Sequence, residues 1–355
     1  MKFLFLLCGL SLFINSCAQK KDLALPEREK DLVESFDMND EELQKFKTLT
    51  TPQVSIEEKK ESPAPVEIKK PSKKKKVEQA PVVTKALVPE VEEEKAPPAQ
   101  EEDLYPEAFK QYDKKSEKFW LSFKPKVFVG EKFVFEVSYV GVKAGTVTIQ
   151  TQPPVLINDK KHYHFMAEMI SADYYSYIYA LKDRIESFVE EEKFLPVKYF
   201  LIQRESGQNV DDLQIFDHEK NMTTHWYKRE KKNKDKKEKK EAVIPKYFQD
   251  SFSALYFIRG FPLKKGDIYQ FPIVTRAKIW LLKVRVMGEE EIEVMDKKIK
   301  AIKLEAETQF PGVLKKSGDI NFWYSADSAR KLLMFKAKVK IGTVEGNLIE
   351  YVEGK

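Results

Sequence analysis

Two histidines are the first residues with the chemistry to bind a metal ion. His162 and His164 lie two positions apart, so on a β-strand their side chains share one face. A zinc site needs at least three protein ligands, and Glu168 is the next candidate on that face, a further turn of the pleat away. Two imidazoles without a recognisable third ligand are more often ordinary strand residues. We therefore predict no metal site and no cofactor, and keep His162 and His164 as the pair to check.

Four tyrosines form the densest aromatic cluster of the chain: Tyr174, Tyr175, Tyr177 and Tyr179. On a β-strand the last three would face one way, where they could stack against a sugar or line an apolar cleft. Packing in the core, with the hydroxyls reaching the surface, explains the same pattern. Tyr175, Tyr177 and Tyr179 are therefore the candidate contacts for a ligand or a partner, and both interpretations stay open.

Catalytic groups are harder to find. Nothing in the spacing selects a pair of carboxylates for glycan cleavage from the 57 acidic residues. Ser251 and Ser253 fall in a predicted helix, without the strand–elbow context that exposes a nucleophilic serine. Asp250 and Arg259 lie at the two ends of that helix, and we expect a structural role for both. Asp250 would cap the helix, and a buried charged pair with strand residues such as Glu186 or Asp327 would hold it on the sheet.

The first residues predict export. Residues 3–14 form an almost unbroken apolar run, shorter than the roughly 20 residues that a membrane-spanning helix needs. The sequence Ile14-Asn15-Ser16-Cys17 resembles the lipoprotein box of bacteria, which implies cleavage before Cys17 and acylation of that residue. Several acyl chains would anchor the protein permanently. Ala18, in place of Asp, resembles the sorting pattern for the outer membrane. Because Cys8 leaves with the signal peptide, the mature chain has no free thiol.

Composition divides the remaining chain in two. Between residues 18 and 104 there are only two aromatic residues, Phe36 and Phe46, and no glycine, so this stretch cannot bury enough apolar surface to fold. Eight prolines between residues 52 and 98 favour extended structure. We expect a signal peptide at residues 1–16, a lipid-anchored, disordered Pro/Lys/Glu-rich tether with a possible short helix at residues 17–104, and a single β-rich domain at residues 105–355.

The positive charge of the chain is local. The whole sequence has 62 Lys+Arg against 57 Asp+Glu, a net charge of +5, and residues 228–241 hold nine basic and four acidic residues, which is also +5. We expect these residues to form an exposed, mobile loop. The rest of the chain is balanced, which argues against a nucleic-acid partner.

Alternating hydrophobicity predicts β-structure from residue 132 onward. Phe133, Phe135, Val137 and Tyr139 would share one face of the first strand, and more than ten similar runs follow. The connections are too short to hold crossover helices, so the strands should pair antiparallel. One helix interrupts them at residues 251–259, with Gly260 in the C′ position and Pro262 just beyond. The predicted fold is mainly β, a large curved antiparallel sheet (a β-roll or partial barrel) with one packed helix, preceded by a disordered linker.

Four short motifs resemble a family of exported bacterial proteins, the domain-of-unknown-function family 3108. They are, in order, Gly130-Glu131-Lys132 with Ala144-Gly145-Thr146, Asp183-Arg184-Ile185-Glu186-Ser187, the segment from Asp250 to Arg259, and Phe322-Trp323-Tyr324 with Gly342-Thr343-Val344. The resemblance covers about residues 125–352. That family has no established activity, so the resemblance assigns no catalytic residue.

These features predict a lipid-anchored envelope lipoprotein, in the outer membrane and facing the periplasm. Its non-enzymatic β domain would bind a partner protein, a cell-wall polymer such as peptidoglycan, or an apolar ligand. An envelope hydrolase acting on glycan or lipid is one alternative, and a structural linker between membrane and cell wall is another. The sequence does not define an oligomeric state.

Overall fold

The computed structural model describes residues 36, 49–50, 105–310, 313–339 and 342–355. The chain divides into two compact units, Met1–Thr51 with Tyr105–Lys355, and Pro52–Leu104. All described residues belong to the first unit. The predicted signal peptide, Cys17 and the predicted tether, apart from residues 36 and 49–50, lie outside the described residues.

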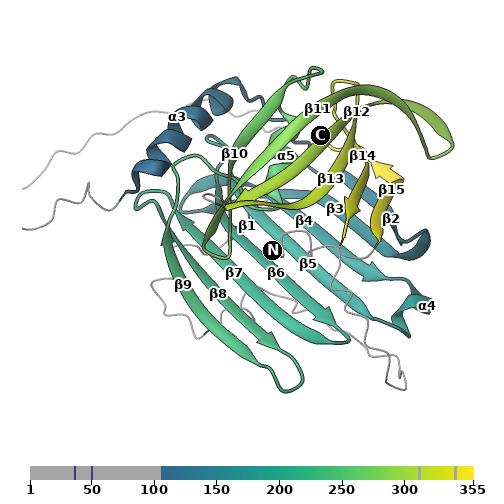
Figure 1. The fold of residues 1–355 in the computed structure, drawn as a ribbon, viewed down its shortest axis with the longest axis horizontal. Helices are drawn as coiled ribbons and strands as arrows, with labels where there is room; N and C mark the ends of the chain where they lie inside the picture. The colour runs from purple at the N-terminus through teal and green to yellow at the C-terminus, as the bar shows by residue number, and fades with distance from the viewer. Residues whose placement is uncertain (1–35, 37–48, 51–104, 311–312, 340–341) are drawn as a thin grey trace, which may run out of the picture. The chain divides into compact units, whose positions relative to one another are not determined.

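The β-strands of this unit form one curved, unclosed antiparallel sheet (Figure 1). The neighbours run β10-β11-β12-β13-β14-β15-β2-β3-β4-β5-β6-β7-β8-β9, and β1 pairs with β3. The strands are β1 Leu49–Thr50, β2 Lys132–Tyr139, β3 Val142–Ile157, β4 Lys160–Ser171, β5 Leu181–Glu190, β6 Pro196–Glu205, β7 Gln208–Asp217, β8 Met222–Glu230, β9 Lys236–Val243, β10 Ile268–Thr275, β11 Lys278–Val294, β12 Lys297–Phe310, β13 Val313–Ser325, β14 Leu332–Lys338 and β15 Thr343–Val352. The predicted fold class, mainly β with a large curved antiparallel sheet, is confirmed.

Helices α3 Glu107–Ser122, α4 Asp173–Ser176 and α5 Ser253–Arg259 accompany the sheet. The predicted helix at residues 251–259 is α5, which packs against the face of the sheet that we call the inner face. Its Tyr256 ring stacks on Phe165 of β4 with 3.7 Å between ring centroids. Helix α3 reaches the same core through Trp120, whose ring lies 4.2 Å from that of Phe257. None of the helices in the described part of the chain is both long and apolar enough to cross a bilayer.

Strands β3, β5, β6 and β7 bury apolar side chains on both faces. Successive residues of a strand point to opposite faces, and on β6 Tyr199 and Leu201 join the inner core, whereas Phe200 and Ile202 belong to a second buried cluster. This second cluster, which we call the outer core, lies on the opposite, outer face. It includes Phe36 from the N-terminal segment.

Gly260 ends α5 for a reason other than the one predicted. Its φ is −80°, so it does not adopt the left-handed conformation of a C′ glycine. A Cβ at this position would lie 2.2 Å from the ring of Phe123 and 2.7 Å from the carbonyl oxygen of Lys124. Close packing beneath the helix end therefore requires the glycine.

The predicted loop at residues 228–241 is wrong: these residues form the hairpin of β8 and β9, with Lys236 opposite Arg229. The basic side chains have partners both across and along the strands. Lys239 Nζ lies 5.3 Å from the centre of the Trp226 ring on β8. Within β9, Glu238 forms ion pairs of 2.7 Å with Lys236 and 2.8 Å with Lys240. Lysines on a terminal strand also discourage pairing with another sheet edge. Charge alone suggested a loop because these partners could not be seen.

Candidate functional site

An apolar cleft opens at the end of the sheet where the β2–β3 turn and α4 lie. It has a volume of about 60 Å³ and is lined from β2, β3, β4, α4, β5 and β15, by residues that include Val137, Val147, Met169, Tyr175, Tyr179 and Leu181. Val137, Val147 and Met169 are also members of the inner core. The cleft, which we call the tyrosine cleft, is therefore an opening in the inner core at this end of the sheet.

Glycines allow the strands to come together beside the cleft. A Cβ on Gly145 would lie 2.2 Å from the carbonyl oxygen of Ile170, so only glycine fits where β3 meets the end of β4. In the β2–β3 turn, Val140 and Gly141 both have positive φ, 50° and 78°. The carbonyl oxygen of Ala144 then accepts a hydrogen bond of 2.8 Å from Ala172 N, which fixes the start of α4.

The candidate tyrosines lie on a helical turn and not on a strand, so the strand spacing considered for them does not apply. Tyr179 N donates a 2.9 Å hydrogen bond to the carbonyl oxygen of Tyr175, which gives these two residues helical spacing. Tyr175 and Tyr179 line the cleft, whereas Tyr177 is 57% exposed and does not. On a strand all three side chains would face one way, whereas the i, i+4 spacing of the helical turn brings only Tyr175 and Tyr179 to the same side.

Exposed apolar side chains surround the cleft. Twelve large hydrophobic residues are exposed in the described part of the chain, and six of them line the cleft or lie within two positions of a lining residue. These six are Val140, Val142, Ile170, Tyr174, Tyr177 and Ile178. Single exposed apolar residues are ordinary, but a cluster of them beside an apolar cleft is typical of a binding surface.

A buried pair of carboxyl groups lies behind Tyr179. The Tyr179 hydroxyl donates to Glu205 Oε2 at 2.5 Å, and the side-chain nitrogen of Gln203 lies 3.1 Å from both Glu205 Oε1 and Asp183 Oδ2. Burial, reinforced by the charge of Glu205, raises the pKa of Asp183 to about 8, and burial also raises the pKa of Glu205. The pair therefore retains a proton near neutral pH.

Arg259 forms a buried, bidentate ion pair with Glu131, a partner that the sequence analysis did not name. The two nitrogen–oxygen distances are 2.6 and 2.7 Å, and Arg259 Nε also donates to the carbonyl oxygen of Ala329 at 2.9 Å. The expected partners are used elsewhere: Glu186 bonds His164, and Asp327 accepts hydrogen bonds from Ser325 Oγ and from backbone nitrogens near it. We call the Arg259–Glu131 pair the clasp.

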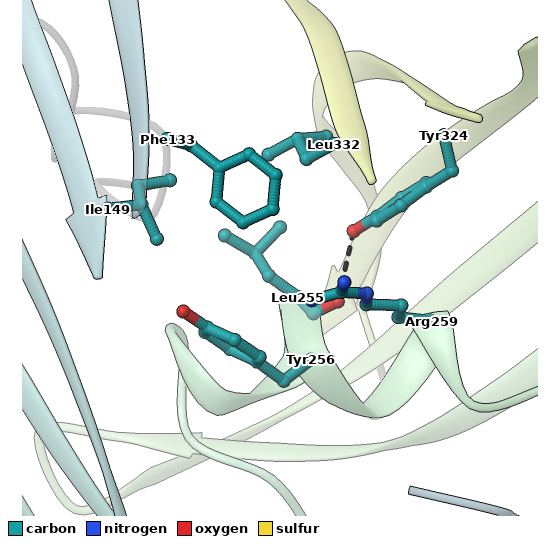
Figure 2. Close-up of a pocket in the computed structure, with 7 residues that line it drawn as sticks. All are labelled: Phe133, Ile149, Leu255, Tyr256, Arg259, Tyr324 and Leu332. Atoms are coloured by element: carbon teal, nitrogen blue, oxygen red, sulfur yellow. Dashed lines mark hydrogen bonds between the residues drawn. The ribbon is translucent and has the colours of Figure 1, made fainter. Parts of the chain in front are cut away.

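A small cavity lies beside the clasp (Figure 2). Its volume is about 20 Å³, enough for one water molecule, and Arg259, Tyr256 and Tyr324 are among its lining residues. The Tyr324 hydroxyl donates to the carbonyl oxygen of Leu255 at 3.0 Å. This cavity is too small for a ligand, so the tyrosine cleft is the better candidate site.

Asp250 holds the other end of α5. Its Oδ1 accepts hydrogen bonds of 2.7 Å from the backbone nitrogens of Phe252 and Ser253, and its Oδ2 accepts one of 2.5 Å from Ser187 Oγ on β5. The helix begins at Ser253, two residues later than predicted. Asp250 thus caps the turn before the helix and connects it to the sheet.

His162 and His164 share the outer face, but each is hydrogen-bonded to a different partner. His164 Nε2 lies 2.6 Å from Glu186 Oε2, and His162 Nδ1 lies 2.8 Å from the carbonyl oxygen of Lys160. Glu168 is bonded to Arg184 at 2.9 Å. Among the described residues, no three His, Cys, Asp or Glu side chains are grouped to hold a metal ion.

Sequence reasoning missed a second buried polar group, around Asp212 on β7. Asp212 accepts from His225 Nε2 at 2.9 Å and from Arg276 Nε at 2.5 Å. Burial opposes ionisation, but the adjacent positive charge of Arg276 holds the pKa of Asp212 below its ordinary value. In the described structure Nδ1 of His225 has no hydrogen-bond partner, so this His–Asp pair lacks the bonded nucleophile of a hydrolase triad.

The fold and the cleft define a partial β-barrel protein that is open at one end of its core. A family model described as "Protein of unknown function (DUF3108)" matches residues 134–349, more than half of the chain, and the chain belongs to this family.

Solved structures show distant similarity. A β-barrel-like protein of domain of unknown function DUF1849 from Brucella abortus is 10% identical, with a TM-score of 0.42, over 64% of this chain and 98% of that one. A protein named as a lipoprotein from Parabacteroides distasonis is 10% identical, with a TM-score of 0.29, over 65% and 99% of the two chains. A protein named as exported, with a YmcC-like fold, from Bacteroides fragilis is 9% identical, with a TM-score of 0.29, over 65% and 99%. No curated protein matches the chain.

The clasp predicts a large loss of stability when one partner is neutralised. Glu131→Gln leaves Arg259 charged and buried without a counter-ion, so we expect the free energy of unfolding in urea to fall by about 3 kcal/mol. Glu136→Gln is the control, because its 2.7 Å ion pair with Lys143 is about half exposed and should contribute less than ~1 kcal/mol. Equal losses in the two variants would contradict the clasp.

The raised pKa of Asp183 predicts a pH dependence of stability. Between about pH 4 and pH 8 the folded protein holds a proton on Asp183 that the unfolded chain has released, so this group stabilises the fold at low pH and the contribution is lost as the pH rises to 8. Asp183→Asn should abolish this loss, which we expect to be a few kcal/mol in order of magnitude. Urea unfolding at pH 5 and pH 8 measures it.

Asp327→Asn is the control for this experiment. The pKa of Asp327 is lowered, so its titration affects stability only in the acid range, below pH 4. The free energy of unfolding could instead change equally between pH 5 and pH 8 in the wild type and in both variants. That outcome would show that Asp183 is ionised in the folded protein.

Proposed function

We propose that this chain is a lipid-anchored envelope protein whose β domain binds the end of an alkyl chain in the tyrosine cleft. The observation that supports this most directly is the apolar cleft with six exposed apolar side chains beside it. Burial of apolar surface contributes about 0.8 kcal/mol per CH₂ group, so the affinity would come from the chain end in the cleft together with the part that lies on the exposed apolar side chains.

The size of the cleft favours a chain end over a whole ligand. Sites for drug-sized molecules have volumes of about 300–1,000 Å³, far above the 60 Å³ of this cleft. The remainder of such a ligand would lie on the exposed apolar side chains around the opening.

The hydrogen bonding of the lining favours an alkyl chain over a cell-wall polymer. A sugar needs donors and acceptors, but the Tyr179 hydroxyl is bonded to Glu205 and Ser171 Oγ is bonded to the backbone of Leu181. A glycan bound here would bury polar groups with few partners, which is unfavourable. A partner protein that inserts an apolar side chain is compatible with the same lining.

An envelope hydrolase is the second candidate, because a carboxyl group with a raised pKa is a common general acid. Asp183 has this property and lies near the cleft through Glu205 and Tyr179. Both carboxyl groups are almost fully buried, however, at 0% and 1% exposure, and neither lines the cleft. Hydrolysis of an ester or glycan that depends on Asp183 would favour this alternative.

The predicted location rests on the N-terminal sequence. Ile14-Asn15-Ser16-Cys17 resembles the lipoprotein box, and Ala18 resembles the sorting pattern for the outer membrane, with the domain facing the periplasm. A structural role between membrane and cell wall would need the same anchor but no ligand in the cleft.

Filling the cleft should abolish ligand binding. We expect a fluorescent C18 fatty acid to bind the mature chain, and Leu181→Trp, which enlarges a lining residue, to weaken its affinity at least about tenfold. Leu121→Trp is the matched control, because Leu121 of α3 is 83% exposed. Fluorescence titration measures both. Absence of binding by the wild type, or equal affinities in the two variants, would contradict the proposed site.

The anchor has a separate test. When the full chain is expressed in a bacterium grown with labelled palmitate, we expect the protein to incorporate the label and Cys17→Ala to lose it. Cys8→Ala should retain the label, because Cys8 lies in the predicted signal peptide. Label that survives Cys17→Ala would overturn the assignment.

A further inference from the structure

The outer core receives a side chain from the N-terminal segment. Phe36 is only 5% exposed and belongs to the same buried cluster as Phe188, Phe200 and Trp226, which lie on β5, β6 and β8. Burying a phenylalanine side chain contributes about 1.5–3 kcal/mol. A contact of this size is sufficient to hold a segment of chain on the sheet.

A second contact follows thirteen residues later and is made by the backbone. Strand β1 pairs antiparallel with β3, with Leu49 opposite Leu156 and Thr50 opposite Val155. Along β3, β2 pairs only as far as Gln150, so β1 occupies a part of the β3 edge that β2 leaves unpaired. Val155 also belongs to the outer core, so both contacts meet at the same region of the sheet.

We propose that Phe36 and Leu49–Thr50 are two docking points of the N-terminal part of this chain, and that the outer face of β3 and β5 to β8 is their binding surface. Phe36 is the anchor, and Leu49–Thr50 fix the register. The proposal is independent of any ligand in the tyrosine cleft, which lies in the inner core.

Docking changes how the domain is held. Eighteen residues lie between Cys17 and Phe36, which makes nineteen Cα–Cα steps, so a lipid on Cys17 would lie within about 65 Å of the outer face at full extension. The distance of the domain from a membrane would then be set by the residues between Cys17 and Phe36.

Disulfide trapping tests the docked register. In the mature chain with Cys17→Ser, kept dilute and oxidised with copper phenanthroline, the pair Thr50→Cys and Val155→Cys should form an intramolecular disulfide in most molecules, since opposed antiparallel residues lie within disulfide range. The control pair, Thr50→Cys with Lys298→Cys on β12, should form it at least about fivefold more slowly. Mass spectrometry of the linked peptides measures both, and equal rates would overturn the docking.

The anchor role of Phe36 has its own control. Added to the Thr50→Cys and Val155→Cys pair, Phe36→Asp should slow cross-linking at least about fivefold, because it places a charge in the outer core. Val66→Asp, in the segment Pro52–Leu104, should leave the rate unchanged. Phe36→Ala, a milder change, should give an intermediate rate. A rate that is insensitive to both Phe36 variants would overturn the role of this residue.

Discussion

The buried ion pair of Arg259 and Glu131 is the constraint on which the rest of the structure depends. Both side chains are almost completely buried, at 2% and 0% exposure, and either charge alone would cost several kcal/mol. Arg259 ends α5 and Glu131 directly precedes β2, while Asp250, before the same helix, is bonded to Ser187 on β5. The helix is thus held at both ends, across strands that are about 14 Å apart in a flat sheet. The sheet therefore curves around a helix that is bonded to it at both ends.

A sheet that curves without closing must protect its two terminal strands. Strand β9 does so with its row of lysines, and β10 is bridged by Gln249, whose side-chain nitrogen also donates to the carbonyl oxygen of Phe194 at 2.8 Å. The turn after β10 reaches across to β7, because Arg276 bonds Asp212. Polar contacts hold this side of the sheet, whereas the apolar tyrosine cleft lies at the end beside α4.

The sequence was sufficient for most of the strands, for α5 to within two residues and for the family, because hydrophobic alternation and capping residues are local signals. The polar partners needed the register of the sheet. Asp183 and Glu205 become neighbours only because Leu181 lies opposite Glu205 and Asp183 opposite Gln203. The partner of Arg259 was similarly hidden among 57 acidic residues, although Glu131 lies in the first family motif. The tyrosine segment was misjudged because the spacing of its aromatic residues fits a strand as well as a helical turn.

The polar groups around the tyrosine cleft are directed away from it, and this limits what the cleft can bind. Tyr179 gives its ring to the lining and its hydroxyl to Glu205, and Glu205 is in turn bonded by Gln203 and Gln208. A ligand that enters the cleft therefore contacts carbon atoms of the lining before the polar groups behind them. Burial raises the pKa of both Asp183 and Glu205, which disfavours a pair of negative charges behind that tyrosine. The lining and the groups behind it therefore both favour an apolar occupant over a charged one.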